Sequence, residues 1–182
     1  ISRSGRRARR SARTGDESLT MRLLLLRHGE ASFDASCDAV RPLTTQGRLE
    51  VRSSLERYLA LESRNGKSDA ELILCVSPLL RAQQTSEIVS AMLPSGFEAR
   101  SRKEIDWLRP DTPIAECLSG IESLALDDAA TVMLVAHNPL LSRLWSFLSD
   151  GEPFFHEIVT GQLVELDCEW LSQGCATVVF QS

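Results

Sequence analysis

The chain has 182 residues, which is the length of one domain with a single hydrophobic core. Its 43% hydrophobic and 25% charged residues are typical of a water-soluble globular protein, and no apolar run approaches the roughly 18–20 residues of a membrane-spanning helix. The net charge of −5 combines +4 in residues 1–20 with −9 in the remainder, which argues against a uniformly nucleic-acid-binding domain.

Residues 1–20 contain six arginines and almost no large apolar side chains, so they cannot bury enough surface to fold alone. They are predicted to be a disordered basic arm, or sequence upstream of a true start at Met21, which precedes a domain over residues 21–182. The alternative hypothesis is a basic tail that binds nucleic acid or a membrane surface.

The cysteine pattern indicates the compartment. Five cysteines are scattered, odd in number and form no CxxC pair: Cys37, Cys75, Cys117, Cys168 and Cys175. Because no secretory signal is visible, we expect reduced thiols in a cytoplasmic protein. Cys168 and Cys175 would face each other across a terminal hairpin, although core or surface thiols are the favoured interpretation.

The first predicted element is a buried strand. Four consecutive leucines at 23–26 lead directly into Arg27-His28-Gly29-Glu30. A short, wholly apolar run is typical of a strand buried on both faces, and open α/β sheets bind ligands just past such strand ends. Arg27 supplies a fixed cation, His28 a candidate nucleophile and Gly29 a turn without side-chain bulk.

A polar connection over residues 31–41 follows, and Thr44 is the expected N-cap of a helix over residues 45–63. Gly47 lies in the first turn of that helix, where glycine weakens it, so a close backbone approach is the expected reason. Arg41 is interpreted either as a residue at the site entrance or as a solvated charge. The predicted buried stripe of the helix comprises Leu49, Leu55 and Leu59.

The second continuous apolar run, residues 72–76, again predicts a buried strand. Ser77 is the expected N-cap of the next helix and Pro78 its first residue. Arg81 then lies in the opening turn, and because helical side chains lean toward the N-terminus, it can point back at the strand end. The alternative interpretation of Arg81 is a surface arginine.

The third buried strand is predicted over residues 131–136 and stops at His137. Asn138 is the expected cap of a helix over 140–148, with Pro139 at its first position. The other predicted elements are a weak strand near 97–101, a loop at 104–111, a helix at about 113–126, a loop at 151–160 that contains His156, and paired or edge strands at 162–167 and 176–180.

Buried strands that alternate with helices predict an α/β layered sheet whose strand ends share one rim. Arg27 and His28, then Arg81, then His137 converge there, and helix N-termini add backbone N–H groups. Two arginines and two histidines in one crevice form an anion site, and the planar guanidinium fork suits phosphate in particular.

Four motifs in this order resemble the histidine phosphatase superfamily, and within it the small SixA-type phosphohistidine phosphatases. They are Arg-His-Gly-Glu at 27–30, Pro-Leu-Thr-x-x-Gly at 42–47, Ser-Pro-x-x-Arg-Ala-x-x-Thr at 77–85 and Val-x-His-Asn-Pro at 135–139. The resemblance covers Met21 to about Phe180. It implies a phosphoglycerate-mutase-like fold, a three-layer α/β/α sandwich with a central, mostly parallel sheet flanked by helices.

The resemblance also implies a two-step phosphoryl transfer. His28 would attack phosphorus and become a phosphohistidine, which water then hydrolyses. Arg27, Arg81 and His137, together with Gly29, would bind the phosphoryl group and stabilise its charge. Nearby cations should lower the pKa of His28 and keep it neutral for attack. No metal and no other cofactor is implied, and the sequence has no recognisable metal-ligand spacing.

The proton donor is the point where the chain departs from the family. Many members have a glutamate proton donor in the segment after the strand that corresponds to residues 97–101 of this chain. By alignment, this chain has Trp107 at that place. The possible donors are Glu30, Asp106 and Asp111, with Glu104 nearby. SixA-type enzymes need a donor less, because a protonated imidazole is already a good leaving group. His156 is interpreted as a surface residue.

The first hypothesis is therefore a metal-independent phosphatase that acts on phosphohistidine in a signalling or phosphotransfer protein. The connections between the four motifs are too short to contain the cap segment that larger branches of the family insert over the site. We therefore expect an exposed pocket that can accept a histidine on a folded partner protein. The alternatives are a phosphatase for small phosphate esters such as sugar phosphates, and a non-catalytic phosphate-binding module. A nucleic-acid partner is disfavoured, and no membrane span is expected.

Overall fold

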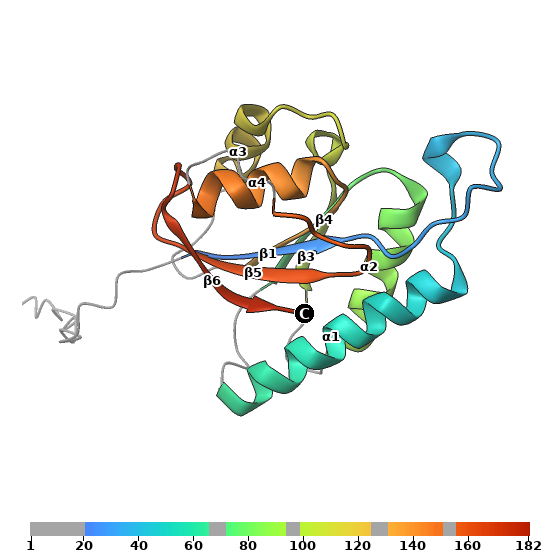
Figure 1. The fold of residues 1–182 in the computed structure, drawn as a ribbon, viewed down its shortest axis with the longest axis horizontal. Coiled ribbons are helices and arrows are strands. Elements are labelled where there is room, and N and C mark those ends of the chain that lie inside the picture. Colours follow the sequence, from blue (N-terminus) through green and yellow to red (C-terminus); the bar gives the residue numbers. More distant parts are fainter. Residues whose placement is uncertain (1–20, 66–71, 94–98, 125–130, 151–155) are drawn as a thin grey trace, which may run out of the picture.

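The computed structural model describes residues 21–65, 72–93, 99–124, 131–150 and 156–182, so the predicted arm at 1–20 lies outside the described residues. The elements form one six-stranded sheet with helices on both faces (Figure 1). The helices and strands are β1 (Met21–Arg27), the 3-10 helix η1 (Asp38–Val40), α1 (Thr45–Asn65), β2 (Leu72–Val76), α2 (Leu80–Met92), β3 (Ala99–Glu104), the 3-10 helix η2 (Asp106–Leu108), α3 (Ile114–Glu122), β4 (Thr131–Ala136), α4 (Leu140–Ser149), β5 (Leu163–Cys168) and β6 (Ala176–Gln181).

The sheet has the strand order β3-β2-β4-β1-β5-β6. The strands β3, β2, β4 and β1 are parallel, whereas β5 runs antiparallel to β1 and β6 antiparallel to β5. Val135 of β4 is in register with Leu26 of β1 on one side and with Val76 of β2 on the other. The carboxyl ends of the three central strands therefore lie side by side at one edge of the sheet.

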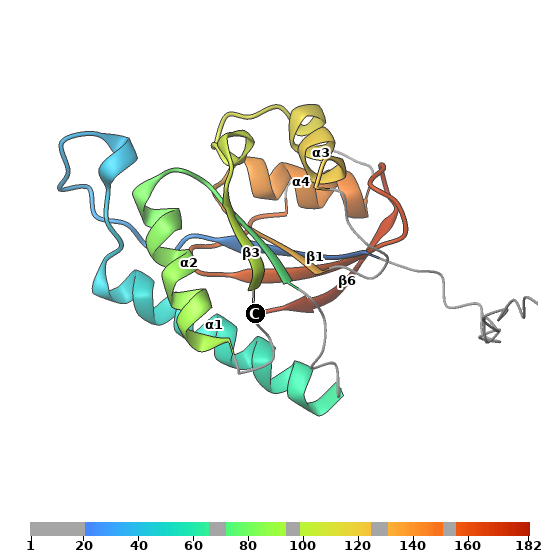
Figure 2. The same cartoon turned by 180° about the vertical axis from the view of Figure 1, so that it is seen from behind.

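The four leucines of β1 divide their side chains between two cores. Leu23 and Leu25 pack into the core that includes α3 and α4, whereas Leu24 and Leu26 pack into the core that includes α1 and α2. All four are fully buried, as a strand covered on both faces requires. Figures 1 and 2 show the two helical layers on opposite faces of the sheet, which confirms the predicted three-layer α/β/α sandwich.

Several predicted boundaries differ from the structure. The strand expected near 97–101 is β3, which extends to Glu104, and the segment expected to be a loop contains η2. The helix expected at 113–126 is the shorter α3. Leu49 is 56% exposed on α1, so its assignment to the buried stripe was wrong, whereas Leu55 is buried. The terminal hairpin of β5 and β6 is confirmed, and all five cysteines are free.

The predicted helix caps have mixed outcomes. Thr44 caps α1, because its Oγ1 accepts a hydrogen bond from the backbone N–H of Gly47 at 2.9 Å. Ser77 and Asn138 do not cap the following helices, which begin at Leu80 and Leu140. Both side chains make tertiary contacts instead.

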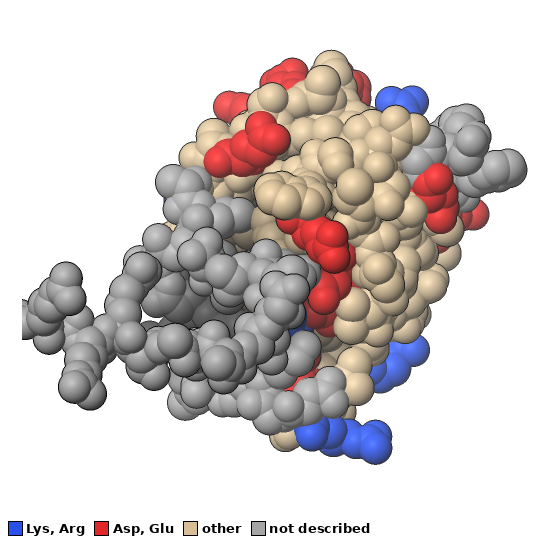
Figure 3. Space-filling view, turned by 90° about the vertical axis from the view of Figure 1, so that its left-hand side faces the viewer, with Lys and Arg blue, Asp and Glu red and all other residues tan. Residues whose placement is uncertain are grey.

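On the face that lies at the left of Figure 1, acidic side chains are scattered from the centre to the upper and right-hand edges, and a few lysines and arginines lie at the margins (Figure 3). This face includes the start of β1, so it is remote from the carboxyl ends of the parallel strands. Among the described residues, no helix is long and apolar enough to span a membrane.

Gly47 allows the start of α1 to contact the segment that follows β1. A Cβ atom at Gly47 would lie 2.2 Å from the carbonyl oxygen of Glu30 and 2.4 Å from its nitrogen. A Cβ atom at Gly29 would lie 2.2 Å from the carbonyl oxygen of Gly47. Such contacts are impossible for real atoms, so these two backbones meet only because both residues are glycine. The expected close approach at Gly47 is confirmed.

Replacing Gly47 with alanine should therefore destabilise the protein, although alanine normally stabilises a helix interior by about 1 kcal/mol over glycine. We expect Gly47→Ala to lower the free energy of unfolding by more than about 2 kcal/mol, measured by chemical denaturation. The matched control is Gln46→Ala at the exposed neighbouring position, which should be close to neutral. A stabilised Gly47→Ala variant would show that the backbone contact is not tight in solution.

Candidate active site

Four predicted site residues lie together at the carboxyl edge of the sheet. Arg27 ends β1, His28 follows it, Arg81 lies in the first turn of α2, and His137 follows β4. The two histidine rings are 4.9 Å apart between centroids, and Arg81 Nε is 3.2 Å from His28 Nε2. His28, Arg81 and His137 are all buried, so water screens their mutual interactions only weakly.

The protonation of His28 follows from its hydrogen bonds. Its Nδ1 lies 2.7 Å from the carbonyl oxygen of Gly29, which can only accept, so Nδ1 carries the proton. Nε2 is then the unprotonated nitrogen, and it accepts a hydrogen bond from Arg81 Nε. The pKa of His28 is lowered to about 4, chiefly by burial; the hydrogen bond to the Gly29 carbonyl opposes this effect, and the charges of Arg81, Arg27 and Arg41 add to it. Burial rather than the expected cations is thus the largest cause.

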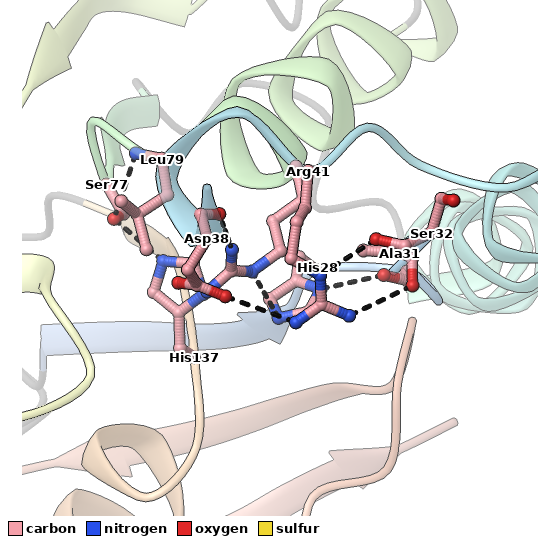
Figure 4. A network of polar contacts seen from close by, with 10 residues as sticks. His28, Ala31, Ser32, Asp38, Arg41, Ser77, Leu79 and His137 are labelled. Atoms are coloured by element: carbon pink, nitrogen blue, oxygen red, sulfur yellow. Dashed lines mark hydrogen bonds and ion pairs between the residues drawn. The ribbon is translucent and has the colours of Figure 1, made fainter. Parts of the chain in front are cut away.

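His137 has a similar environment with a different partner. Its Nε2 lies 2.7 Å from the hydroxyl oxygen of Ser77, which is fully buried after β2 (Figure 4). The backbone N–H of Leu79 lies 3.5 Å from the same oxygen and uses one of its two lone pairs. We assign the hydroxyl proton of Ser77 to a hydrogen bond with Nε2 of His137, an assignment that the tautomer measurement below tests. His137 is then protonated on Nδ1, which is buried without a partner among the described residues. Burial lowers the pKa of His137 to about 2, with contributions from His28 and the nearby arginines.

Arg27 adds a second buried donor. Its Nη1 donates to the carbonyl oxygen of Ile158 at 2.7 Å, which fixes the guanidinium against the segment before β5. Its Nε is buried and has no hydrogen-bond partner in the described part of the chain. Burial lowers the pKa of Arg27 from its usual value, but an arginine remains protonated at neutral pH.

Two residues of this site were missed in the sequence. Ser77 was expected only as a helix cap, although its place directly after β2 was a signal that it lies at the same edge as His28. Asp38 contacts Arg81 twice: its carbonyl oxygen accepts from Nη1 at 2.8 Å, and its Oδ2 pairs with Nη2 at 3.1 Å. Asp38 lies in a polar connection without a periodic pattern, so no sequence signal pointed to it.

Gly29 positions the nucleophile through its backbone. Its carbonyl oxygen accepts from His28 Nδ1, and its N–H lies 3.4 Å from the hydroxyl oxygen of Thr85 on α2. Thr85 in turn donates to the carbonyl oxygen of Arg81 at 2.8 Å. These contacts connect the segment after β1 to the same turn of α2 that carries Arg81.

The possible proton donors lie around this group rather than within it. Glu30 accepts a hydrogen bond from Thr44 at 2.7 Å, and Asp106 is 87% exposed and pairs with Arg109 at 3.0 Å. Asp111 is also exposed. Trp107 is partly buried and packs against the core that includes α3, next to Gly120. The donor among Glu30, Asp106 and Asp111 stays a prediction.

The third histidine, His156, lies apart from the other two. Its ring stacks on Trp145 at 4.1 Å between centroids and pairs with Asp150, so it has a structural role. Within the described ranges, no group of three His, Cys, Asp or Glu residues is arranged to hold a metal ion.

The arrangement combines one acceptor with several donors. His28 Nε2 presents a lone pair, while Arg27 Nε and His137 Nδ1 present buried N–H groups without acceptors in the described part of the protein. Arg81 adds a guanidinium in direct contact with His28. A nucleophile beside fixed donors and positive charge is the constellation that phosphoryl transfer needs, because positioning and charge stabilisation dominate that chemistry.

Nuclear magnetic resonance of the histidine ring nitrogens can test the two assignments. We expect His28 and His137 both to be neutral at pH 6 and protonated on Nδ1, because burial disfavours a charged ring. Ser77→Ala should leave His28 unchanged and convert His137 to a mixture of tautomers, since Nε2 loses its donor. The matched control is Ser54→Ala, another buried serine, whose hydroxyl contacts Ser182 instead.

Unfolding provides an independent check on the same shifts. Both rings protonate near pH 6.5 when unfolded but only at much lower pH when folded, so the unfolded chain takes up protons between these values. The free energy of unfolding should therefore fall as the pH is lowered from about 6.5 toward 4. A ring of His28 or His137 that is charged at pH 6 in the folded protein would contradict the assignment of that residue.

No family model matched the chain. The phosphohistidine phosphatase SixA of Escherichia coli (strain K12) is 35% identical over 134 residues, which is 72% of this chain and 76% of that protein. The structure of the protein histidine phosphatase SixA complexed with tungstate matches with a TM-score of 0.70 and 30% identity, over 88% of this chain and 96% of that one.

The fold is also shared more widely. A mycobacterial glucosyl-3-phosphoglycerate phosphatase in complex with VO3 matches with a TM-score of 0.52 over 80% of this chain and 92% of that one, at 18% identity. At that identity the match shows the fold alone. The identity to SixA extends over most of both proteins, and the fold agrees with it. The chain therefore belongs to the SixA-type branch of the histidine phosphatase superfamily.

Proposed function

We propose that this protein is a phosphatase that removes the phosphoryl group from phosphohistidine in a partner protein, through a phosphohistidine intermediate on His28. The observation that carries the proposal is the lone pair of His28 Nε2 beside Arg27 Nε and His137 Nδ1, buried donors that lack a partner among the described residues. Its likeness to SixA, a phosphohistidine phosphatase, supports the substrate class. A cytoplasmic location and a catalytic domain over 21–182 remain parts of this proposal.

The first step is attack on phosphorus by the lone pair of His28 Nε2, which becomes available when the Nε–H of Arg81 turns from it to a phosphoryl oxygen. A bond forms between Nε2 and phosphorus, the bond from phosphorus to the substrate nitrogen breaks, and its electron pair leaves with the substrate imidazole. A substrate ring that is already protonated leaves as neutral imidazole. The phosphorylated His28 ring is then cationic, and the Gly29 carbonyl that accepts from Nδ1 stabilises that charge.

The second step is hydrolysis of the intermediate. A water molecule attacks phosphorus, the bond to Nε2 breaks, and its electron pair returns to His28. The proton of the attacking water stays with the released phosphate or passes to solvent. His28 is again neutral with its proton on Nδ1, so the ring is ready for another cycle.

The surrounding donors have defined roles in both steps. Arg27 and Arg81 neutralise the charge of the phosphoryl oxygens, and His137 donates one uncharged N–H from Nδ1. Ser77 acts through His137, because its hydroxyl holds Nε2 as the acceptor and so keeps the proton on Nδ1. Ser77 is thus a positioning residue rather than a group that touches substrate.

His28→Ala should abolish turnover while the protein stays folded, because the ring lies past the end of β1 and outside both hydrophobic cores. After incubation with substrate and rapid quenching, acid-labile phosphate should appear on the wild-type chain and not on the variant. The matched control is His156→Ala, which removes the histidine that pairs with Asp150 and should keep turnover. Phosphate trapped on a residue other than His28 would remove it as the nucleophile.

Turnover should also depend strongly on the leaving group. Trp107, partly buried against the core, takes the position at which many family members are expected to have a glutamate donor. General acid help is typically worth about 10²–10⁴-fold. Phosphohistidine needs little of this help, whereas an alkyl phosphate leaves as a poor alkoxide. We therefore expect a steep decline in rate across phosphate esters of rising leaving-group pKa.

A flat series would contradict this expectation and would mean that a competent acid exists. Alanine variants of Glu30, Asp106 and Asp111 would then identify it. That outcome would favour the alternative function, a phosphatase for small phosphate esters. A protein phosphohistidine substrate measured beside the ester series distinguishes the two functions directly.

A further inference from the structure

Asp38 holds the outer nitrogens of the Arg81 guanidinium. The Asp38 carbonyl oxygen accepts from Nη1 at 2.8 Å, and its carboxylate oxygen Oδ2 lies 3.1 Å from Nη2 (Figure 4). The third nitrogen, Nε, donates to His28. An arginine has five N–H donors, so three of them are directed to His28 and Asp38. A phosphoryl group that binds Arg81 must share or displace these contacts.

The connection that carries Asp38 is fixed at its base and by Arg41. Ala31 and Leu43 form a β-bridge, and the N–H of Thr44 donates to the carbonyl of Glu30 at 2.9 Å. The connection projects from the sheet at the end to which β1 points, at the right of Figure 1. Asp38 thus has a defined position beside the site.

Arg41 holds the connection together through hydrogen bonds to its backbone. Its guanidinium donates to the carbonyl oxygens of Ser32 and Ala31 at 2.8 and 3.1 Å, and lies over the ring of Phe33. It also pairs with Asp38 Oδ1 at 3.1 Å. The Asp38 carboxylate therefore bridges two arginines, one on the connection and one beside the nucleophile.

Asp38 is charged in this position. Partial burial acts to raise the pKa of its carboxyl, but the hydrogen bond from Arg41 and the charge of Arg81 outweigh that effect and lower it. The side chain is 61% exposed, so solvent screens its field and limits its effect. A partly screened carboxylate that pairs with the arginine in contact with the nucleophile can bias which ligands bind without preventing binding.

We infer that Asp38 is a specificity-determining residue that selects the charge around the phosphoryl group. Its carboxylate competes with phosphoryl oxygens for Arg81 and repels further anionic groups on the substrate. It thereby favours phosphoryl groups attached to neutral or cationic groups, such as a protonated imidazole. This inference rests on the proposed function and refines its substrate class.

Asp38→Asn can test the inference because it removes the charge but keeps the shape and one oxygen that can accept from Arg81. The matched control is Asp34→Asn, an exposed aspartate of the same connection, for which the structure shows only a backbone hydrogen bond to Ser32. Both variants lose one negative charge within the same connection, so the control corrects for the change in net charge. Thermal unfolding confirms that each variant is folded.

The probe is tungstate, a tetrahedral oxyanion, measured by titration calorimetry on the full chain at fixed ionic strength. Asp38→Asn should bind tungstate roughly three- to tenfold more tightly, as loss of a partly screened like charge predicts. Asp34→Asn should change the affinity by less than about twofold. Raising the salt concentration should shrink the difference between Asp38→Asn and the wild type.

A second pair of probes distinguishes selection by the charge of the ligand from an equal gain in affinity for every phosphate ligand. Phosphocholine carries a cation near its phosphate, whereas 3-phosphoglycerate carries a carboxylate, and each can compete with tungstate. Asp38→Asn should tighten 3-phosphoglycerate several-fold more than phosphocholine. An equal gain for both would overturn charge selection.

Unchanged or weaker tungstate binding by folded Asp38→Asn would also overturn the inference, because Asp38 would then merely hold Arg81 in place. That result leaves the proposed phosphatase activity untouched. Conversely, a wild-type protein that binds tungstate but hydrolyses no phosphohistidine would refute the proposed function. The effect of Asp38→Asn on oxyanion binding would still be measured in that case.

Discussion

The parallel register of β1, β4 and β2 is the constraint on which the site depends. These three strands form the middle of the sheet and are covered by helices on both faces, so the residues along their buried middle must be apolar. Toward the carboxyl edge, the first positions free of that requirement are the strand ends, such as Arg27, and those just past them. Because Leu26 and Val76 both pair with Val135, those positions lie next to one another. The core thus determines where polar chemistry is possible.

The two site histidines illustrate how similar burial leads to different chemistry. Burial keeps both rings neutral by lowering the pKa of each, and both carry their proton on Nδ1. In His28 that proton is directed to a carbonyl, which leaves the lone pair of Nε2 for reaction. In His137 the lone pair is directed to a serine hydroxyl, which leaves the N–H of Nδ1. One backbone oxygen and one hydroxyl therefore distinguish a nucleophile from a donor.

The fold was predictable because its signals are local and repeated. Apolar runs such as residues 72–76 revealed the buried strands, and the tendency of polar groups to gather past strand ends brought His28 and His137 together from the sequence alone. Gly47 was correctly linked to a close backbone approach, because glycine weakens a helical turn and is favoured there when a Cβ atom has no room.

The errors share a physical cause, which is that tertiary contacts override local preference. Ser77 has the residue type and position of a helix cap, yet its hydroxyl binds His137, and the helix starts three residues later. Leu49 fits an apolar stripe but lies on an exposed part of α1. Asp38 reaches Arg81 across 43 positions of sequence, a distance over which no periodic pattern extends.

The connection between Ala31 and Leu43 leaves and re-enters the fold at nearly the same point, since its two ends pair with each other. The length of the connection can therefore change without moving the strand and the helix that it joins, β1 and α1. Closing a loop becomes only slightly harder as it grows, by about 0.6 kcal/mol for each doubling of its length. A protein built in this way can exchange the whole segment beside its nucleophile, by natural variation or by design, and acquire a different substrate preference while the catalytic framework stays where it is.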